Sequence, residues 1–224
     1  MSFILNIDTA VASASVCLSH EGKSKAWKIN PEPKDSAAWL HTAIWQLLQE
    51  AHLSLHQLSA IAVSAGPGSY TGLRVGMASA KGLCYALDKP LITINTLQMM
   101  AAAAVAAGVD TQLICPMIDA RRMEVFAAVY NPQLQEVAPS RAVILQEDSF
   151  VEFLAQNTVC FLGNGSKKFK SVQSHPHAFF NDISVNATHI ADLAHMELLK
   201  NNFADLAYTE PFYGKEFYSP AHNN

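Results

Sequence analysis

A glycine-rich stretch at residues 64–83, SAGPGSYTGLRVGMASAKGL, is the first candidate for chemistry in the chain. Turns of this kind that lead into a helix often bind phosphate through free backbone N–H groups. A P-loop requires a lysine directly after its last glycine, whereas Lys81 here precedes Gly82. The dinucleotide-binding pattern fails as well, because Thr71 stands where its third glycine would be. The spacing therefore favours a tight strand-to-helix turn, with Ser69 or Thr71 as the helix cap.

Metal-binding and nucleophilic residues form no recognisable site in the sequence. His52 and His56 have the H-x-x-x-H spacing that suits a metal on a helix, but they follow the end of the first expected helix. His175 and His177 flank a proline in a loop. No G-x-S-x-G elbow occurs, and the four cysteines lie in apolar stretches without a C-x-x-C pair. We therefore predict no catalytic residue, no metal ligand and no disulfide.

The composition indicates a globular chain. With 224 residues, 50% of them hydrophobic and 15% charged, it can form one large domain or two small ones around a sizeable core. A formal net charge of −4 argues against binding nucleic acid through the field of this chain alone. The longest apolar run, residues 99–108, has about half the length of a membrane span. We expect a cytoplasmic protein that does not associate with membranes.

Periodicity and turn signals predict a similar order of elements twice. The first half should contain strands over 3–7, 14–18 and 25–29, a helix from 35 or 36 to about 51, a strand over 60–64, the glycine-rich helix, a strand over 91–94 and an alanine-rich helix to 108. The second half should contain strands near 113–118, 124–130 and 142–145, a helix over 148–155, a strand over 159–162 and a helix over 190–200. We expect the first three strands to form an antiparallel meander.

Each half opens with a strand that ends in aspartate, Asp8 in NIDTA and Asp119 in MIDAR. Two βββαβα halves with such aspartates are the layout of the actin-like ATPase superfamily. We therefore predict an α/β protein made of two RNase H-like halves with the actin-like ATPase (ASKHA) fold. The expected parts are residues 1–109, residues 110–206 and a tail, 207–224, whose aromatic stretch EPFYGKEFY should pack on the body.

The resemblance to actin-like ATPases makes an ATP site the obvious hypothesis, with the two aspartates beside the phosphates and the metal. The next residues weaken it, because a phosphate loop needs glycine for close backbone approach, and Thr9 and Ala120 follow the aspartates here. FLGNGS at residues 161–166 stands where such folds place an adenosine loop, but short glycine turns are common. We therefore predict that the chain alone binds no cofactor.

Several segments together resemble the TsaB (YeaZ) family of bacteria over residues 3–217: IDTA, SVCL, the whole glycine-rich stretch, PLITINTL and PMIDARRMEVFAAVY. Members of that family are non-catalytic partners of TsaD in forming N6-threonylcarbamoyladenosine beside the anticodon of tRNA, together with the ATPase TsaE. The resemblance implies an accessory subunit that forms a heterodimer with TsaD and meets tRNA only through the complex. It also implies that the older glycoprotease label is a misnomer.

The sequence departs from TsaD where TsaD-like chains carry H-x-x-x-H for a metal. The corresponding positions here are Thr96 and Met100, and neither residue replaces an imidazole. This departure implies that the metal-dependent transferase site is absent.

Helical wheels of the first two helices separate a core stripe from an outer flank. The core stripes comprise Leu40, Ala43, Ile44, Leu47, Leu48 and Ala51 in the first helix and Leu73, Met77, Ala80, Cys84 and Leu87 in the second. Trp39 and Trp45 fall outside the first stripe. Gly76 and Gly82 each cost roughly 1 kcal/mol relative to alanine, so we expect another helix to pack closely against them.

These outer flanks predict a partner interface. Two tryptophans off the core and a flank of small residues suit a helix-on-helix contact with aromatic anchors. The TsaB family contacts TsaD through a bundle of helices from the N-terminal halves, which the resemblance places at the same two helices. The predicted interface comprises Trp39, Trp45, Arg74, Ala78, Lys81 and Gly82.

Two rival functions and one further contact remain open. The chain could be a stand-alone actin-fold ATPase or small-molecule kinase, or a self-associating scaffold that forms a homodimer through the same helices. A basic patch for tRNA phosphate could form from Arg121, Arg122, Lys167, Lys168 and Lys170. A solvated turn and a solvated helix face explain these five residues more simply.

Overall fold

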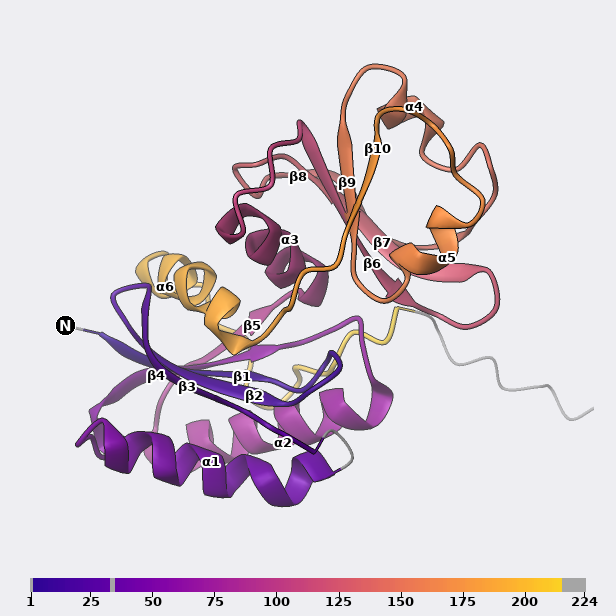
Figure 1. Ribbon diagram of the computed structural model, residues 1–224. Helices are drawn as coiled ribbons and strands as arrows, with labels where there is room; N and C mark the ends of the chain where they lie inside the picture. Colours follow the sequence, from indigo (N-terminus) through magenta and orange to yellow (C-terminus); the bar gives the residue numbers. More distant parts are fainter. Residues whose placement is uncertain (1, 33–34, 215–224) are drawn as a thin grey trace, which may run out of the picture.

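The computed structural model describes residues 2–32 and 35–214 of the chain, which form two mixed five-stranded sheets (Figure 1). The first has the order β3-β2-β1-β4-β5, and the second has the order β10-β9-β6-β7-β8. Read from β8, the second sheet repeats the order of the first, with the chain's next five strands in the same places. The prediction of two halves with one design is confirmed.

The strands of the first sheet are β1 (Phe3–Asp8), β2 (Ser15–His20), β3 (Lys23–Ile29), β4 (Leu58–Ser64) and β5 (Leu91–Ile94). Those of the second are β6 (Leu113–Asp119), β7 (Glu124–Tyr130), β8 (Glu136–Ile144), β9 (Val159–Leu162) and β10 (Ala178–Asn181). The helices are α1 (Ser36–Glu50), α2 (Tyr70–Leu87), α3 (Thr96–Ala106), α4 (Val151–Leu154), α5 (Ser166–Lys170) and α6 (Ala191–Leu199), with short 3-10 turns at Leu55–Gln57 and Ala187–Ile190. In each sheet the first three strands form the expected antiparallel meander, and the first strand pairs in parallel with the fourth.

The second half differs from its prediction in detail. β8 begins at Glu136 rather than near Ala142, because an exposed edge strand tolerates Pro139 and mixed polarity. α4 is a single turn rather than the helix expected over 148–155. β10 and α5 were not predicted, since four and five residues are too few to show a period.

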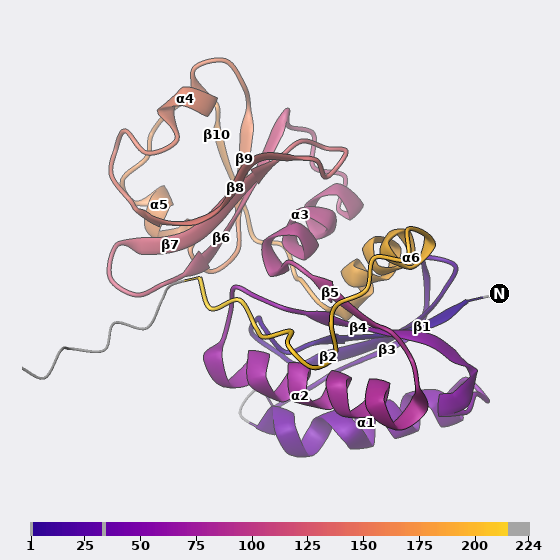
Figure 2. The same cartoon turned by 180° about the vertical axis from the view of Figure 1, so that it is seen from behind.

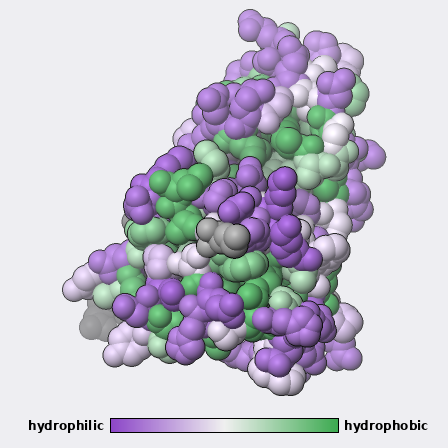
Figure 3. Space-filling view, turned by 90° about the vertical axis from the view of Figure 1, so that its left-hand side faces the viewer, coloured by the Kyte–Doolittle hydropathy of each residue, from purple (hydrophilic) through white to green (hydrophobic). Residues whose placement is uncertain are grey.

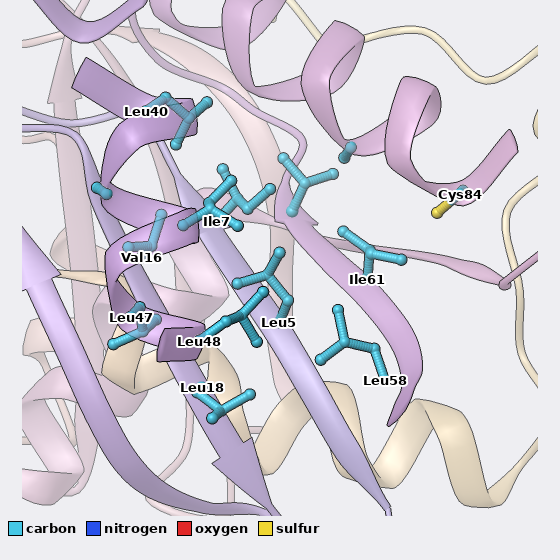
Figure 4. Packing of buried hydrophobic residues seen from close by; sticks show 14 of the residues in the cluster. Leu5, Ile7, Val16, Leu18, Leu40, Leu47, Leu48, Leu58, Ile61 and Cys84 are labelled. Atoms are coloured by element: carbon cyan, nitrogen blue, oxygen red, sulfur yellow. The ribbon is translucent and has the colours of Figure 1, made fainter. Parts of the chain in front are cut away.

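The two longest helices cover the outer face of the first sheet (Figures 1 and 2). Both predicted core stripes are confirmed, with Ala51 and Leu87 at the half-buried ends of the stripes. Figure 4 shows Leu40, Leu47 and Leu48 of α1 directed toward Leu5, Ile7 and Val16 of the strands. This packing leaves the opposite sides of α1 and α2 facing solvent.

Helices α3 and α6 lie on the inner side, between the sheets (Figure 1). α3 is apolar all round, as expected of a helix covered on two sides. Its Leu97 and Ala101 pack with the second sheet, whereas Met99 packs with the first. α6, although it follows the second half in sequence, packs on the first sheet through Ala194. The boundaries at 109 and 206 therefore stay a prediction. No helix in the described part of the chain is both long and apolar enough to cross a membrane.

The two interior glycines of α2 have different surroundings, and this corrects the expectation of a helix packed against Gly76. A β-carbon on Gly76 would collide with the hydroxyl of Thr9, so the chain's own β1–β2 loop takes the space. A β-carbon on Gly82 would meet nothing within 4 Å.

Alanine at each of these glycines gives a paired stability prediction. We expect Gly82→Ala to stabilise the fold by about 1 kcal/mol, because it gains helix propensity in open space. We expect Gly76→Ala to destabilise it by about 1–3 kcal/mol through overpacking. Urea unfolding of both variants measures the difference in unfolding free energy. Equal changes in the two variants would contradict the conclusion that Thr9 occupies the space beside Gly76.

Candidate partner-binding face

The turn before α2 is filled by the chain itself. Ser69 caps the helix by accepting a hydrogen bond from the Gly72 N–H at 3.2 Å. A β-carbon on Gly68 would meet the Ala10 carbonyl, and one on Gly72 would meet the Thr9 carbonyl. The Thr9 hydroxyl also donates to the Gly72 carbonyl at 2.7 Å. These glycines therefore permit close contact with the β1–β2 loop.

The first strand-end aspartate is wholly buried. Asp8 Oδ1 accepts hydrogen bonds from the Ser64 hydroxyl at 2.6 Å and from the Ala10 N–H at 2.9 Å. No described residue hydrogen-bonds Oδ2. Burial raises the pKa of Asp8 from 3.8 to about 6, against the lowering effect of the two hydrogen bonds. Asp8 thus holds the end of β4 and the β1–β2 loop together.

The second strand-end aspartate is exposed and paired. Lys168 Nζ lies 2.8 Å from Asp119 Oδ1, and this hydrogen bond holds the pKa of Asp119 below its usual value. A cleft of about 880 Å³ opens between the halves and is lined by Asp119, Lys167 and Ser69, among others. Asp8 is absent from that lining, so the two aspartates do not face one ligand. Within residues 2–32 and 35–214, no group of three or more histidine, cysteine or acidic side chains could hold a metal ion.

The histidine and cysteine positions have structural roles or lie in solvent. His52 and His56 are exposed. Thr96, at the first of the two positions where TsaD-like chains carry histidine, accepts a hydrogen bond from the Gly66 N–H at 3.1 Å. Met100, at the second, is buried. All four cysteines are free and buried, and burial raises the pKa of Cys84 to about 11, which makes it a poor nucleophile.

Three of the six predicted interface residues, Trp45, Ala78 and Gly82, lie on the outer face of α1 and α2. Trp45 is 63% exposed, and Ala78 and Gly82 are exposed on the neighbouring helix. Ser79 Oγ lies 3.2 Å from His41 Nε2, which ties the two helices together along this face. Trp39 differs from the expectation, because it is half-buried and packs against the core of the first sheet.

The structure adds to this face Tyr85, an aromatic residue that is not among the predicted interface residues. Tyr85 is 84% exposed and lies one turn after Gly82. Tyr85 follows Gly82 by three residues and Ala78 by seven, and this spacing could have indicated that all three lie on the same side of the helix. We call Trp45, Ala78, Gly82 and Tyr85 the outer helix face.

Arg74 and Lys81 contact the C-terminal segment of the chain. Lys81 Nζ donates to the carbonyls of Ala207 at 3.3 Å and Thr209 at 3.1 Å. Arg74 donates to the Tyr213 hydroxyl at 3.0 Å, and its guanidinium lies 4.2 Å from the centre of the Tyr70 ring. Both cations therefore border the outer helix face while holding this segment against α2.

The C-terminal segment, residues 204–214, crosses from one half to the other. It begins at a bridge between Ala204 and Leu91 and passes the turn before α2, where the Phe212 N–H donates to the Ala65 carbonyl at 2.7 Å. It reaches the second half at Gly214, whose φ is 76° and which lies directly against the ring of Phe126. A larger residue at Gly214 would collide there, which explains the glycine. The remaining predicted tail, 215–224, lies outside the described residues.

Figure 3 shows the side on which the chain begins, where hydrophobic residues lie in several patches separated by hydrophilic ones.

Comparison with known proteins supports one family. Residues 29–209 match the family model described as TsaD, tRNA N6-adenosine threonylcarbamoyltransferase. The chain is 33% identical to the tRNA threonylcarbamoyladenosine biosynthesis protein TsaB of Bacillus subtilis, over 75% of this chain and 74% of that protein. It is 29% identical to TsaB of Haemophilus influenzae, over 94% of this chain and 92% of that protein.

Solved structures support the fold. YeaZ from Pseudomonas aeruginosa superposes with a TM-score of 0.82 at 24% identity, over 95% of this chain and all of that chain. An inorganic polyphosphate/ATP-glucomannokinase from Arthrobacter sp. strain KM superposes with a TM-score of 0.51 at 13% identity, over 90% of this chain and 100% of that one. The actin-like ATPase fold is confirmed, and the chain belongs to the family of the TsaD model and, within it, to the TsaB (YeaZ) family.

Proposed function

We propose that this chain is a non-catalytic cytoplasmic subunit that binds TsaD through the outer helix face and organises it for threonylcarbamoyladenosine formation in tRNA. TsaE is the third member of the assembly. The observation that carries the proposal is the outer helix face itself, where exposed Trp45 and Tyr85 flank exposed Ala78 and Gly82. Aromatic anchors beside small residues permit the close approach that helix-on-helix packing requires.

The C-terminal segment extends this surface. Lys81 holds the carbonyls on either side of Tyr208, whose side chain is 84% exposed. An interface on α2 would therefore include part of this segment. Arg74 and Lys81 then contribute to the interface by positioning the C-terminal segment. Trp39, which is half-buried, contributes by packing α1 against the core.

Reconstitution tests the proposal. Purified TsaD, TsaE, threonylcarbamoyl-adenylate, ATP and tRNA should form the modified nucleoside with this chain present and should lose most of that activity without it. Equal activity with and without the chain would disprove the role.

Two rival functions have distinct outcomes. ATP turnover by the chain alone would support a stand-alone ATPase or kinase, although Gly68 and Gly72 lie against Ala10 and Thr9, and Asp8 does not line the cleft. A homodimer that persists when TsaD is added would support a self-associating scaffold. Light scattering with and without TsaD separates that case from a heterodimer.

A further inference from the structure

Five cations from two separate segments form one surface on the second half. We call this surface the basic patch; it comprises Arg121, Arg122, Lys167, Lys168 and Lys170. The arginines occupy the loop between β6 and β7, and the lysines are on α5. Lys168 joins the two segments, because its Nζ lies 2.8 Å from Asp119 Oδ1 and 3.5 Å from the Glu124 carbonyl oxygen, on either side of the loop.

The patch is held rigidly. Phe169 of α5 is fully buried and packs edge-to-face on Phe161, with 4.9 Å between ring centres. The Asn164 side chain accepts a hydrogen bond from the Asp119 N–H at 2.9 Å, which fixes the turn before α5 to the end of β6. Because the main chain that carries these side chains is already fixed, little backbone entropy is lost when they bind a ligand.

The loop conformation is an independent observation. Arg121 has a φ of 73° and Arg122 a φ of 48°, in the left-handed region where glycine and asparagine are favoured. Nothing in the backbone calls for arginine at either position. Arginine at two positions whose φ values disfavour it points to a role for the arginine side chains themselves.

The charges are also available. Among the described residues, Lys168 alone of the five makes an ion pair. The other four side chains are exposed, on a chain whose formal net charge is −4. It extends to the cleft between the halves, which Lys167 lines.

We propose that the basic patch binds the phosphodiester backbone of RNA once the chain is assembled with TsaD; this rests on the proposed function. Exposed lysines and arginines without an aromatic anchor suit a polyanion better than a protein surface, whose hot spots are aromatic and buried. The negative net charge keeps the chain alone a weak RNA binder, so the contact adds to affinity that the partner supplies.

Charge reversal tests the patch. Lys167→Glu with Lys170→Glu should weaken tRNA binding by the TsaD complex at least about tenfold and lower the salt slope by roughly 0.7–0.9 for each phosphate that the patch no longer neutralises. Lys23→Glu with Lys25→Glu, on the exposed edge strand β3, changes the net charge equally and should leave binding within about twofold. Equal effects of the two pairs would overturn the proposal.

A second variant separates charge from folding. Arg121→Gly with Arg122→Gly removes two charges and suits both φ values, so we expect an unchanged or raised melting temperature together with weaker tRNA binding. Association with TsaD is measured in the same preparations without RNA. If the wild-type chain does not associate, the proposed function fails. If the patch variants fail to bind TsaD rather than tRNA, the patch is a protein contact and the RNA proposal fails.

Discussion

Gly82→Leu should reduce the affinity of the chain for TsaD by about 10- to 100-fold while leaving the chain folded. In the free chain a side chain at position 82 points into open space, and leucine is the better helix former by nearly 1 kcal/mol. Against a closely packed helix the same side chain overpacks the contact, at a cost of about 1–3 kcal/mol. Since 1.4 kcal/mol corresponds to tenfold in affinity, the loss is large. Titration calorimetry against TsaD measures it.

Matched variants make this result specific. Gly82→Ala adds one carbon and should bind TsaD almost as the wild type does. Trp45→Ala should weaken binding by about 2 kcal/mol, as expected for an aromatic anchor. Trp27→Ala is its control, because Trp27 is 56% exposed on β3 but lies on the side of the strand that faces away from α1. Its neighbour Lys28, on the opposite side, forms the ion pair with Glu50 of α1. Full binding by a folded Gly82→Leu protein would show that TsaD docks elsewhere.

The parts of the fold that follow from local periodicity could be predicted from the sequence. The core stripes of α1 and α2 were correct because a buried helix face repeats every three to four residues. The strand-end aspartates also indicated the repeated halves, because each stands at the end of an apolar strand that opens its half. Short elements such as α5 and β10 carried no period and were missed.

Contacts between distant segments could not be predicted in this way. Thr9, not another helix, fills the space at Gly76, and nothing near either residue in the sequence announces the pairing. Lys81 binds the main-chain carbonyls of Ala207 and Thr209. Because every residue has a main-chain carbonyl, the residue types at these positions do not reveal the contact. The wheel therefore gave no hint that the chain's own C-terminal segment lies beside Lys81.

Asp8→Asn should change the pH dependence of stability more than any other single substitution at the strand ends. The pKa of Asp8 is about 6 in the folded chain and near 3.8 when unfolded, so the folded state binds the extra proton between these values. The stability that this proton provides is present below pH 3.8 and is lost as the pH rises through 6. A shift of about two pKa units corresponds to about 3 kcal/mol. Asparagine stays neutral, and its Oδ1 can accept the same bonds from Ser64 and Ala10.

The difference in unfolding free energy between Asp8→Asn and the wild type should therefore move by about 2 kcal/mol in favour of the variant between pH 4 and pH 7. Any constant offset from the new amide N–H, which occupies the unbonded Oδ2 position, leaves this slope unchanged. Asp119→Asn is the control: its carboxylate pairs with Lys168 and its pKa is lowered, so its stabilising effect is lost only at more acidic pH. Urea titrations across this range would contradict the buried, proton-binding role of Asp8 if both differences were flat. A rise for Asp8→Asn alone would identify Asp8 as a buried structural carboxyl whose ionisation destabilises the fold.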